Sequence, residues 1–367
     1  MENVYEKYHV SHIINASGKM TILGGSRVSK EVCEHMNLGA THFFEIKDLL
    51  DKTGEYLADL IGVEAAYIVN SASGAIAQSV ASCVSQGDSY QLLHLHNSEN
   101  KKREIVLCKG HNVDYGTPIE VTIGVGGGKV VEAGYANLCT LEHVQSCINE
   151  NTVALIYVKS HHCVQKGMPD MKEFIDLGHQ NHLPVIVDAA AEEDLLKYYQ
   201  MGADVVIYSG TKAFEGPTSG LMIGKKDFID QVKKQSHSIG RVMKIGKENI
   251  LGLTYAVERY LQRQHLTLEQ QARRLSLFHE KINQIDGLSA KCVQDGAGRL
   301  IIRSEITFHK GNAMEVAQKL KTGDIKIYTR DYRANEGKIE IDIRDVNDQE
   351  LEIIYEKIEK IMEGSSL

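Results

Sequence analysis

The sequence has few features that would place it outside ordinary globular proteins. Only four of its 367 residues are proline and no low-complexity tract occurs, which argues against a disordered chain. No apolar run reaches the about 18 residues that a membrane-spanning helix needs. The polar start MENVYEKYHV is unlike a signal peptide, so we expect a cytoplasmic protein without a membrane partner.

Cysteine pairs and basic blocks are missing as well. The seven cysteines are scattered without a CxxC pair, which argues against a zinc ribbon or a thioredoxin-like site and indicates reduced thiols. The histidines show no metal-ligand spacing, so we expect no metal site. The net charge of −8, from 41 basic and 49 acidic residues, argues against nucleic acid as the main partner.

Apolar strands alternate with helices through the middle of the chain. The expected strands cover residues 65–69, 153–158, 184–187 and 205–209, and the expected helices cover 45–61, 72–84, 171–180 and 193–201. Continuous apolar strands between helices are typical of a buried, mostly parallel sheet. The sequence therefore predicts an α/β fold for this part of the chain.

The pattern changes towards the C-terminus. A long helical stretch over 246–285 is followed by shorter elements, which predict strands over 300–308, 325–329 and 338–343 and helices over 313–320 and 349–362. The segment 338–343, KIEIDI, alternates as a half-exposed strand does. We therefore expect an N-terminal arm (1–45), a large domain (46–250), and a long helix with a small α+β domain (251–367).

Three polar segments follow apolar strands, where ligands of open α/β sheets bind. Ser71-Ala72-Ser73-Gly74 begins a helix and suits a phosphate, although a simple N-cap explains it equally well. Asp188 ends the strand PVIV and needs a cationic partner or a helix to cap. Lys212 follows Ser209-Gly210-Thr211, where desolvation would favour nucleophilic use; the alternative is a surface loop.

Together these segments have the layout of an enzyme that depends on pyridoxal 5'-phosphate (PLP). A phosphate cradle comes first, then a strand-terminal aspartate, then a lysine about two dozen residues later. In such enzymes the aspartate holds the pyridine N–H and the lysine forms a Schiff base with the cofactor.

Four segments carry a resemblance to a known group. VNSASGAIA (69–77), VDAAAE (187–192), SGTKAFEGPTSGLMIGKKDFI (209–229) and IDIRD (341–345) resemble the selenocysteine synthase-like group of fold type I PLP enzymes. The opening INASGKMTILGGS (14–26) is similar to the D-glucosaminate-6-phosphate ammonia-lyase branch. The resemblance implies an aspartate aminotransferase-like large domain with a mostly parallel sheet and a small C-terminal α+β domain.

The resemblance also implies roles for residues around the cofactor. Lys212 would be the Schiff-base lysine, and Asp188 would pair with the pyridine nitrogen. His111, in CKGHNVDYG, would stack on the pyridine ring; the alternative is an ordinary loop histidine. The cofactor phosphate would contact the remaining small residues, which are Ser73, Gly74 and Ser209.

Further residues are implied at a subunit contact and around the substrate. Gly216 and Thr218 lie where such enzymes bring a neighbouring subunit to the phosphate, which implies a homodimer or higher homo-oligomer. Arg344 would bind the substrate carboxylate, unless it pairs with Asp342 or Asp345 on the surface. Arg330 would bind a substrate phosphate, unless it lies in a solvated turn. Thr21 would reach into the site from the arm; the alternative is that Gly24 and Gly25 only make this segment a flexible turn.

The activity implied is that of an ammonia-lyase on D-glucosaminate 6-phosphate or a related sugar amino acid. Lys212 would remove the Cα proton, the Cβ hydroxyl would leave as water, and a 2-oxo acid and ammonia would be released. The motifs leave open an aminotransferase or a Cα–Cβ aldolase acting on a β-hydroxy amino acid. A selenocysteine synthase-like transferase fits the acidic charge less well, and a non-catalytic PLP-binding protein is the remaining alternative.

Overall fold

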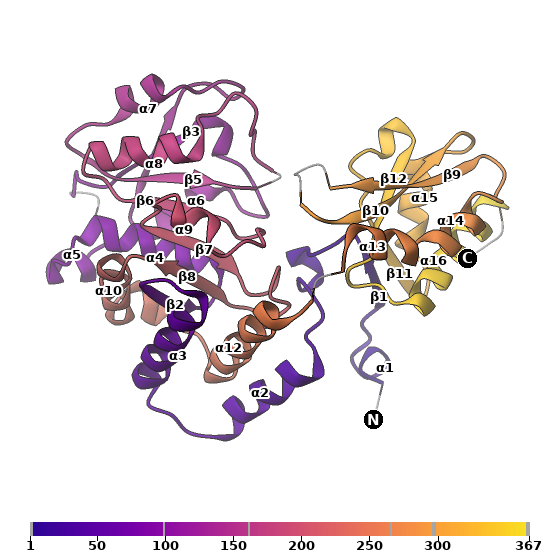
Figure 1. The fold of residues 1–367 in the computed structure, drawn as a ribbon, viewed down its shortest axis with the longest axis horizontal. Coiled ribbons are helices and arrows are strands. Elements are labelled where there is room, and N and C mark those ends of the chain that lie inside the picture. Colours follow the sequence, from indigo (N-terminus) through magenta and orange to yellow (C-terminus); the bar gives the residue numbers. More distant parts are fainter. Residues whose placement is uncertain (1–2, 98–99, 161, 265, 296–298, 365–367) are drawn as a thin grey trace. The chain divides into compact units, whose positions relative to one another are not determined.

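The computed structural model describes residues 3–97, 100–160, 162–264, 266–295 and 299–364. The chain divides into two compact units, drawn in Figure 1. The large unit comprises residues 27–263, and the small unit comprises residues 1–26 and 264–367.

These boundaries differ from the three segments expected from the sequence, 1–45, 46–250 and 251–367. The expected arm divides because β1 (His12–Ala16) pairs in parallel with β11 (Ile325–Thr329) of the small unit. The helix expected to open the third segment, α12 (Lys247–Gln262), belongs to the large unit. Its residues Leu253 and Val257 are part of that unit's core, and Tyr255 stacks on His35 of α2 (Lys30–Thr41).

A seven-stranded sheet forms the centre of the large unit, with the strand order β2-β8-β7-β6-β5-β3-β4. Its strands are parallel except β8, which runs antiparallel to both of its neighbours. The expected mostly parallel sheet is therefore confirmed. The strands are β2 (Ala65–Val69), β3 (Glu104–Cys108), β4 (Lys129–Ala133), β5 (Thr152–Val158), β6 (Val185–Asp188), β7 (Val205–Ser209) and β8 (Gly220–Gly224).

Helices cover both faces of this sheet. One core contains Leu57 of α3, Phe174 of α8 and Leu253 of α12, and the other is built with α4, α6 and α10. Adjacent strand residues such as Val206 and Ile207 point into opposite cores, so the strands are apolar throughout. The helices are α2 (Lys30–Thr41), α3 (Ile46–Ile61), α4 (Ala72–Ser85), α5 (Ser89–Leu93), α6 (Ile119–Val125), α7 (Leu141–Cys147), α8 (Met171–Gln180), α9 (Lys197–Gln200), α10 (Lys226–Lys234), α11 (Ile239–Val242) and α12.

The small unit is α+β, as expected. An antiparallel sheet of order β12-β10-β9 and the β1–β11 pair share one core with the helices. Besides β1 and β11, its elements are α1 (Val4–Tyr8), α13 (Leu268–Arg274), α14 (Ser276–Ile282), β9 (Leu288–Gln294), β10 (Ile302–Phe308), α15 (Ala313–Leu320), β12 (Lys338–Asp342) and α16 (Asp348–Met362).

Three expectations about secondary structure need correction. The helix expected over 193–201 shortens to the single turn α9. The stretch 246–285 is not one helix, because the described residues form α12, α13 and α14, and a capping box between Thr267 and Gln270 starts α13 anew. Strand β12 is not half-exposed, since every residue from Ile339 to Asp342 is buried.

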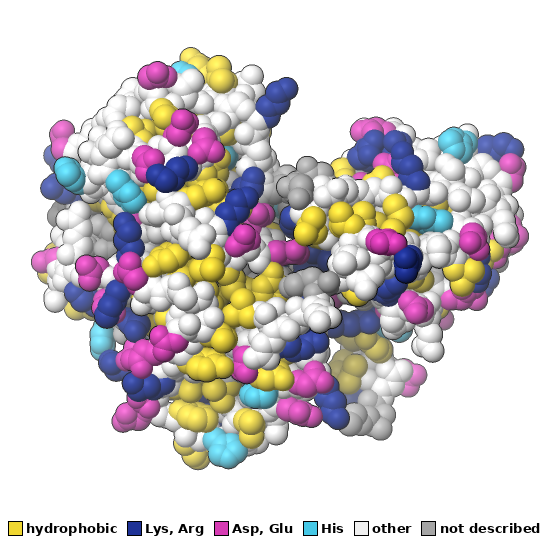
Figure 2. Space-filling view, in the orientation of Figure 1, with side chains coloured by type: hydrophobic (Ala, Val, Ile, Leu, Met, Phe, Trp, Pro, Cys, Tyr) yellow, Lys and Arg dark blue, Asp and Glu magenta, His cyan; other side chains and the backbone are white. Residues whose placement is uncertain are grey.

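Charged side chains of both signs are interspersed over the face shown in Figure 2. None of the helices in the described part of the chain combines the length and the apolar character needed to cross a membrane.

Candidate active site

The polar segments that follow the strands of the large sheet meet at one edge, which we call the carboxyl edge. Strands β5, β6 and β7 end there in parallel, and Val158 pairs with Asp188. Val69 at the end of β2 and Ser209 at the end of β7 both pair with Gly220 of β8. The segments that begin at Ser71 and at Ser209 therefore leave the sheet side by side.

The start of α4 offers backbone donors at this edge. The Ser71 hydroxyl accepts a hydrogen bond from the Gly74 N–H at 2.9 Å, so the expected N-cap is present. The N–H groups of Ala72 and Ser73 donate no hydrogen bond to any residue that the structure describes. A Cβ atom at Gly74 would collide with Asn70 Oδ1, so a larger residue there would have to displace the Asn70 side chain. Two unused amides at the positive end of a 14-residue helix suit a phosphate.

Asp188 is the last residue of β6 and is only 6% exposed. Its Oδ1 accepts one hydrogen bond, from the Ala190 N–H at 3.1 Å. Burial raises the pKa of the carboxyl group above its usual value, although the nearby Lys212 charge and the Ala190 N–H act in the opposite direction. A buried carboxylate with so few donors is costly, and a protonated ring nitrogen would compensate it. The residue therefore fits the pyridine nitrogen of PLP.

His111 ends the 3₁₀ turn after β3 and has no solvent exposure. Its Nδ1 accepts a hydrogen bond from the Val158 N–H at 3.4 Å, and the ring meets Tyr157 edge-on with centroids 4.5 Å apart. Nε2 is buried without a hydrogen-bond partner among the described residues. Burial, assisted by the charge of Lys159, lowers the pKa of His111 to about 4. The histidine is thus neutral and only partly satisfied by the protein.

This lowered pKa predicts a pH dependence of stability. A histidine whose pKa is lower in the folded than in the unfolded chain contributes its full stabilisation at pH values above 6.5, the pKa in the unfolded chain. This contribution is lost as the pH falls towards about 4, the pKa in the folded protein. The loss amounts to roughly 3 kcal/mol in the free energy of unfolding. Urea unfolding at pH 7.5 and 4.5 should show a smaller pH effect in His111→Gln than in the wild type. The exposed His309→Gln is the control, and an equal pH effect in all three proteins would contradict the assignment.

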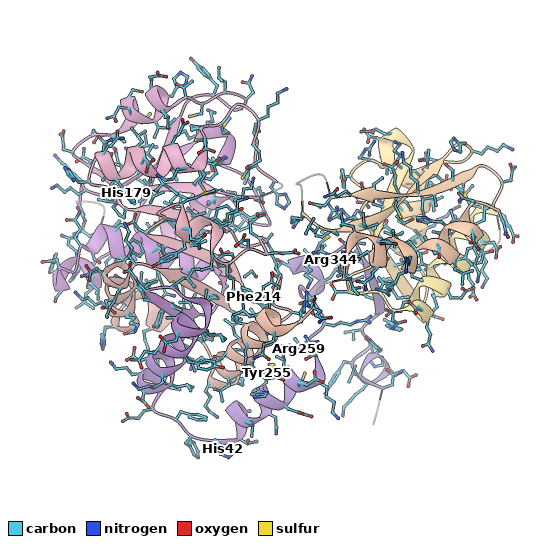
Figure 3. All side chains as sticks on the ribbon, in the orientation of Figure 1. His42, His179, Phe214, Tyr255, Arg259 and Arg344 are labelled. Atoms are coloured by element: carbon cyan, nitrogen blue, oxygen red, sulfur yellow. The ribbon has the colours of Figure 1, made fainter. Side chains whose placement is uncertain are left out.

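Lys212 lies in a fixed loop after β7. Its backbone N–H donates to Ser209 O at 3.3 Å, and the half-buried side chain is close enough to Asp188 to affect that carboxyl group. Phe214, labelled in Figure 3, is buried against the rings of Tyr208 and Tyr260. The structure therefore places Lys212 at the carboxyl edge together with Asp188, not in a solvated surface loop.

The same loop contains a residue that sequence reasoning missed. Glu215 has a φ angle of 54°, in the left-handed region that non-glycine residues rarely adopt. Its carboxylate pairs with Arg263 Nη1 at 2.9 Å and lies 3.9 Å from Nη1 of Arg259, which is labelled in Figure 3. The buried Gly216 follows, and its N–H donates to Gly210 O at 2.8 Å. These contacts hold the backbone that carries Lys212.

Two other residues complete the surroundings of this edge. Tyr115 was also missed by sequence reasoning, although it lies in the segment that was singled out for His111. Its hydroxyl is 2.9 Å from Thr122 Oγ1 and lies close to the Ser73 side chain. Thr218 is exposed, and its carbonyl oxygen accepts a hydrogen bond from Asn249 at 3.1 Å. Tyr115 is therefore in a position to orient the hydroxyl of Ser73 at the phosphate cradle.

Arg344, labelled in Figure 3, lies in the small unit. It forms a two-point ion pair with Asp342. Its Nε and Nη2 lie 3.0 and 2.9 Å from the two carboxylate oxygens. Asp342 is fully buried, so this is not the surface pair considered from the sequence. A second guanidinium, that of Arg303, reaches Asp342 at 3.0 Å. Although burial disfavours the charged form, the two arginines hold the pKa of Asp342 below its usual range.

The backbone at Gly18 packs against this ion pair within the small unit. A Cβ atom at Gly18, whose φ is 89°, would lie 2.8 Å from an Asp342 oxygen and 3.2 Å from Arg344 Nη2. Arg330 donates to Ser17 O at 3.3 Å, and its Nε lies 3.5 Å from Glu340, so it does not lie in a solvated turn. Thr21 is exposed at the start of the 3₁₀ turn Thr21–Leu23. The small unit thus brings Gly18, Arg330 and Arg344 together.

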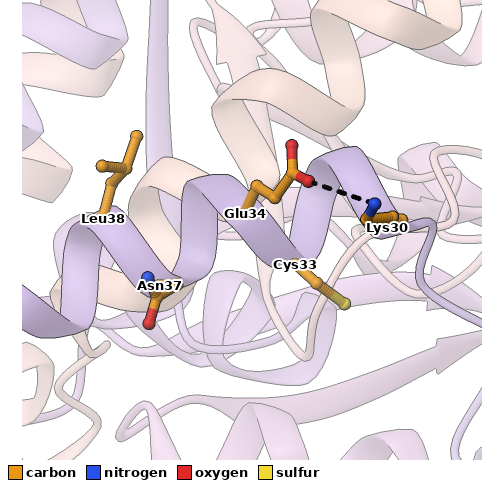
Figure 4. A pocket seen from close by; sticks show the side chains of 5 residues that line it. All are labelled: Lys30, Cys33, Glu34, Asn37 and Leu38. Carbon is orange, nitrogen blue, oxygen red and sulfur yellow. Dashed lines mark ion pairs between the residues drawn. The ribbon is translucent and has the colours of Figure 1, made fainter.

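A shallow depression on the surface of the large unit, shown in Figure 4, lies elsewhere. It has a volume of about 480 Å³ and is lined by Lys30, Cys33, Glu34, Asn37 and Leu38 of α2. Its charged residues, Lys30 and Glu34, form an exposed ion pair at 3.9 Å. None of the expected site residues lies there. In the described ranges, no group of three His, Cys, Asp or Glu residues is arranged to hold a metal ion.

The fold and the carboxyl edge define an aspartate aminotransferase-like enzyme of fold type I, the fold of a large class of PLP-dependent enzymes. Residues 13–326 match the model of the L-seryl-tRNA selenium transferase (SelA) family, and the chain belongs to this family.

Relatives that match the chain over almost its whole length show which proteins of the family it is similar to. The chain is 44% identical to a D-glucosaminate-6-phosphate ammonia lyase of Salmonella typhimurium over 99% of both chains. It is 34% identical to a 5'-C-glycyluridine monooxygenase-decarboxylase of a Streptomyces species, over 98% of this chain and 92% of the relative. A solved structure of D-glucosaminate-6-phosphate ammonia-lyase superposes with a TM-score of 0.93, at 44% identity and with 100% and 99% coverage. The resemblance inferred from the sequence segments is confirmed.

Proposed function

We propose that this chain is a PLP-dependent ammonia-lyase that converts D-glucosaminate 6-phosphate, or a closely related sugar amino acid, to a 2-oxo acid and ammonia. The observation that carries the proposal is the pair Asp188 and Lys212 at the carboxyl edge, in a chain 44% identical over its whole length to such a lyase. The monooxygenase-decarboxylase relative is less similar and shows that this fold supports other reactions.

The residues of the carboxyl edge have the chemical groups needed to bind the phosphate and the pyridine ring of PLP. The amides of Ser73 and its neighbours at the start of α4, with Gly74 and Ser209 beside them, would hold the phosphate. Asp188 would keep a proton on the pyridine nitrogen, and the neutral ring of His111 would pack against the pyridine face. When bound, PLP supplies an electron sink for the electron pair left at the substrate Cα.

Lys212 would hold the cofactor and then handle the protons of the reaction. Its Nζ takes the proton from the substrate Cα and returns it to the Cβ hydroxyl, which leaves as water. Addition of one water to the imine tautomer of the released enamine gives the 2-oxo acid and ammonia. The net change is loss of ammonia alone, so no oxidant or reductant is needed.

Arginines of the small unit would recognise the charged ends of the substrate. Arg344, held in one orientation by Asp342, would bind the carboxylate with its remaining N–H groups. Arg330 would contribute to binding the phosphate, and Thr21 would contact the substrate from its exposed turn. Gly216 and Thr218 would meet the neighbouring subunit of a homodimer near the cofactor phosphate.

The test is product analysis with the PLP-loaded protein and D-glucosaminate 6-phosphate. We expect ammonia and a 2-oxo acid in equal amounts over many turnovers. Transfer of the amino group without free ammonia would instead identify an aminotransferase, and an aldehyde fragment would identify an aldolase. Absence of all three reactions on this substrate would refute the proposed substrate class.

A further inference from the structure

A second lysine lies at the carboxyl edge, beside the pair assigned to the cofactor. Lys159 directly follows β5, and its backbone N–H donates to the carbonyl oxygen of Asp188 at 2.8 Å. Its side chain is partly buried. Because its charge affects both His111 and Cys163, the ammonium group lies near these two buried side chains.

This ammonium group lacks an acidic partner. Its Nζ donates to Gln165 Oε1 at 3.1 Å, and Gln165 in turn donates to Ser160 O at 3.4 Å. No carboxylate of the described residues comes within 4.0 Å of Lys159, whereas two other lysines of the large unit pair closely with acids. Lys225 lies 2.7 Å from Asp204, and Lys233 lies 3.0 Å from Asp51.

The ring of His111 provides another donor in the same neighbourhood. Because Nδ1 of the neutral His111 ring accepts from the Val158 N–H, the ring proton resides on Nε2. By distance and angle this buried N–H has no hydrogen-bond acceptor among the residues that the structure describes, although the nearby Val164 backbone favours the charged form of the ring. A partly desolvated ammonium and an unpaired N–H are both costly, and an anionic oxygen group would compensate both.

We infer that Lys159, supported by Gln165 and with the Nε2–H of His111 nearby, forms a binding site for an anionic group of the substrate. This inference rests on the proposed function, since the substrate there carries two such groups, a carboxylate and a phosphate. Lys159 is thus a specificity-determining residue of the large unit.

The test uses unreactive analogues and the PLP-loaded protein. D-gluconate 6-phosphate and D-gluconate lack the amino group, so calorimetry reports their binding without turnover. Lys159→Gln should weaken binding about 10- to 100-fold, the loss expected for one hydrogen bond between charged groups. Lys159→Arg should retain most of the affinity. Lys166→Gln removes the same charge from an exposed position in the same loop and should bind as the wild type does.

The two analogues distinguish the two anionic groups. A loss confined to D-gluconate 6-phosphate assigns the site to the phosphate, and an equal loss with both assigns it to the carboxylate. Equal binding by wild type and Lys159→Gln, including no binding by either, would overturn the inference. So would a change in cofactor absorbance alone, because Lys159 would then act on PLP. Ammonia release by the wild type is measured separately, so a failure of the proposed function is recognised as such.

Discussion

Replacing Lys212 with alanine is expected to abolish ammonia release and to remove the visible absorbance of PLP joined to the protein. The side chain would hold the cofactor and also move the proton at Cα, so the rate should fall by at least about 10⁴-fold. The main-chain contacts of the loop do not depend on this side chain, because the Lys212 N–H and the ring of Phe214 provide them. The loss should therefore occur without unfolding.

A lysine on the same unit provides the control for this experiment. Lys226 is exposed and pairs with Asp230 within α10, so Lys226→Ala should retain both the absorbance and the rate. Absorbance spectra and ammonia assays of the two variants can be compared directly. Normal turnover by Lys212→Ala would contradict the assigned role.

Replacing Arg303 with methionine should destabilise the protein by about 3–5 kcal/mol, the cost of leaving buried charges without a partner. Arg303 is 2% exposed and lies between two buried carboxylates, at 2.6 Å from Asp295 and 3.0 Å from Asp342. Without it, Asp295 keeps Arg299 and Asp342 keeps Arg344, but each loses its most buried partner. Equilibrium unfolding in urea measures the change.

An exposed ion pair of the same unit provides the control for this loss of stability. Lys310 lies 2.6 Å from Asp286, and both side chains are largely exposed. Lys310→Met should therefore change the free energy of unfolding by only about 0–1 kcal/mol. If both methionine variants cost the same, the buried network does not have the role assigned to it.

The residues that sequence reasoning located best share one property. Asp188 ends the apolar strand β6 and Lys212 follows the apolar strand β7, and both strands are buried on both faces. Because parallel strands end at one edge, the pattern predicted both the sheet and the place where polar groups gather. The N-terminus of α4 could be predicted for the same reason, from small residues after β2.

Other features depend on tertiary contacts that a local pattern does not contain. The alternation of KIEIDI predicted a half-exposed strand, yet Glu340 and Asp342 are buried because Arg303 and Arg330 reach them from elsewhere in the chain. The left-handed conformation of Glu215 has no sequence signal, since glycine is the residue expected there. Its partner Arg263 is 48 residues away.

The significance of Lys159 likewise required the structure. In the sequence it is one of 41 basic residues, and only the register of β5 against β6 places it beside Asp188. The division of the N-terminal arm at Ser26 was unpredictable for a similar reason. The pairing of β1 with β11 joins segments about 300 residues apart.

The central claim is that the carboxyl edge of the large sheet holds PLP through Lys212. The most direct measurement is borohydride reduction of the PLP-loaded protein, which fixes the cofactor to its lysine, followed by peptide mass spectrometry. The account predicts a single modified residue, Lys212, in the peptide that follows β7. Modification of Lys159 or another lysine in its place, or no modified peptide, would contradict it.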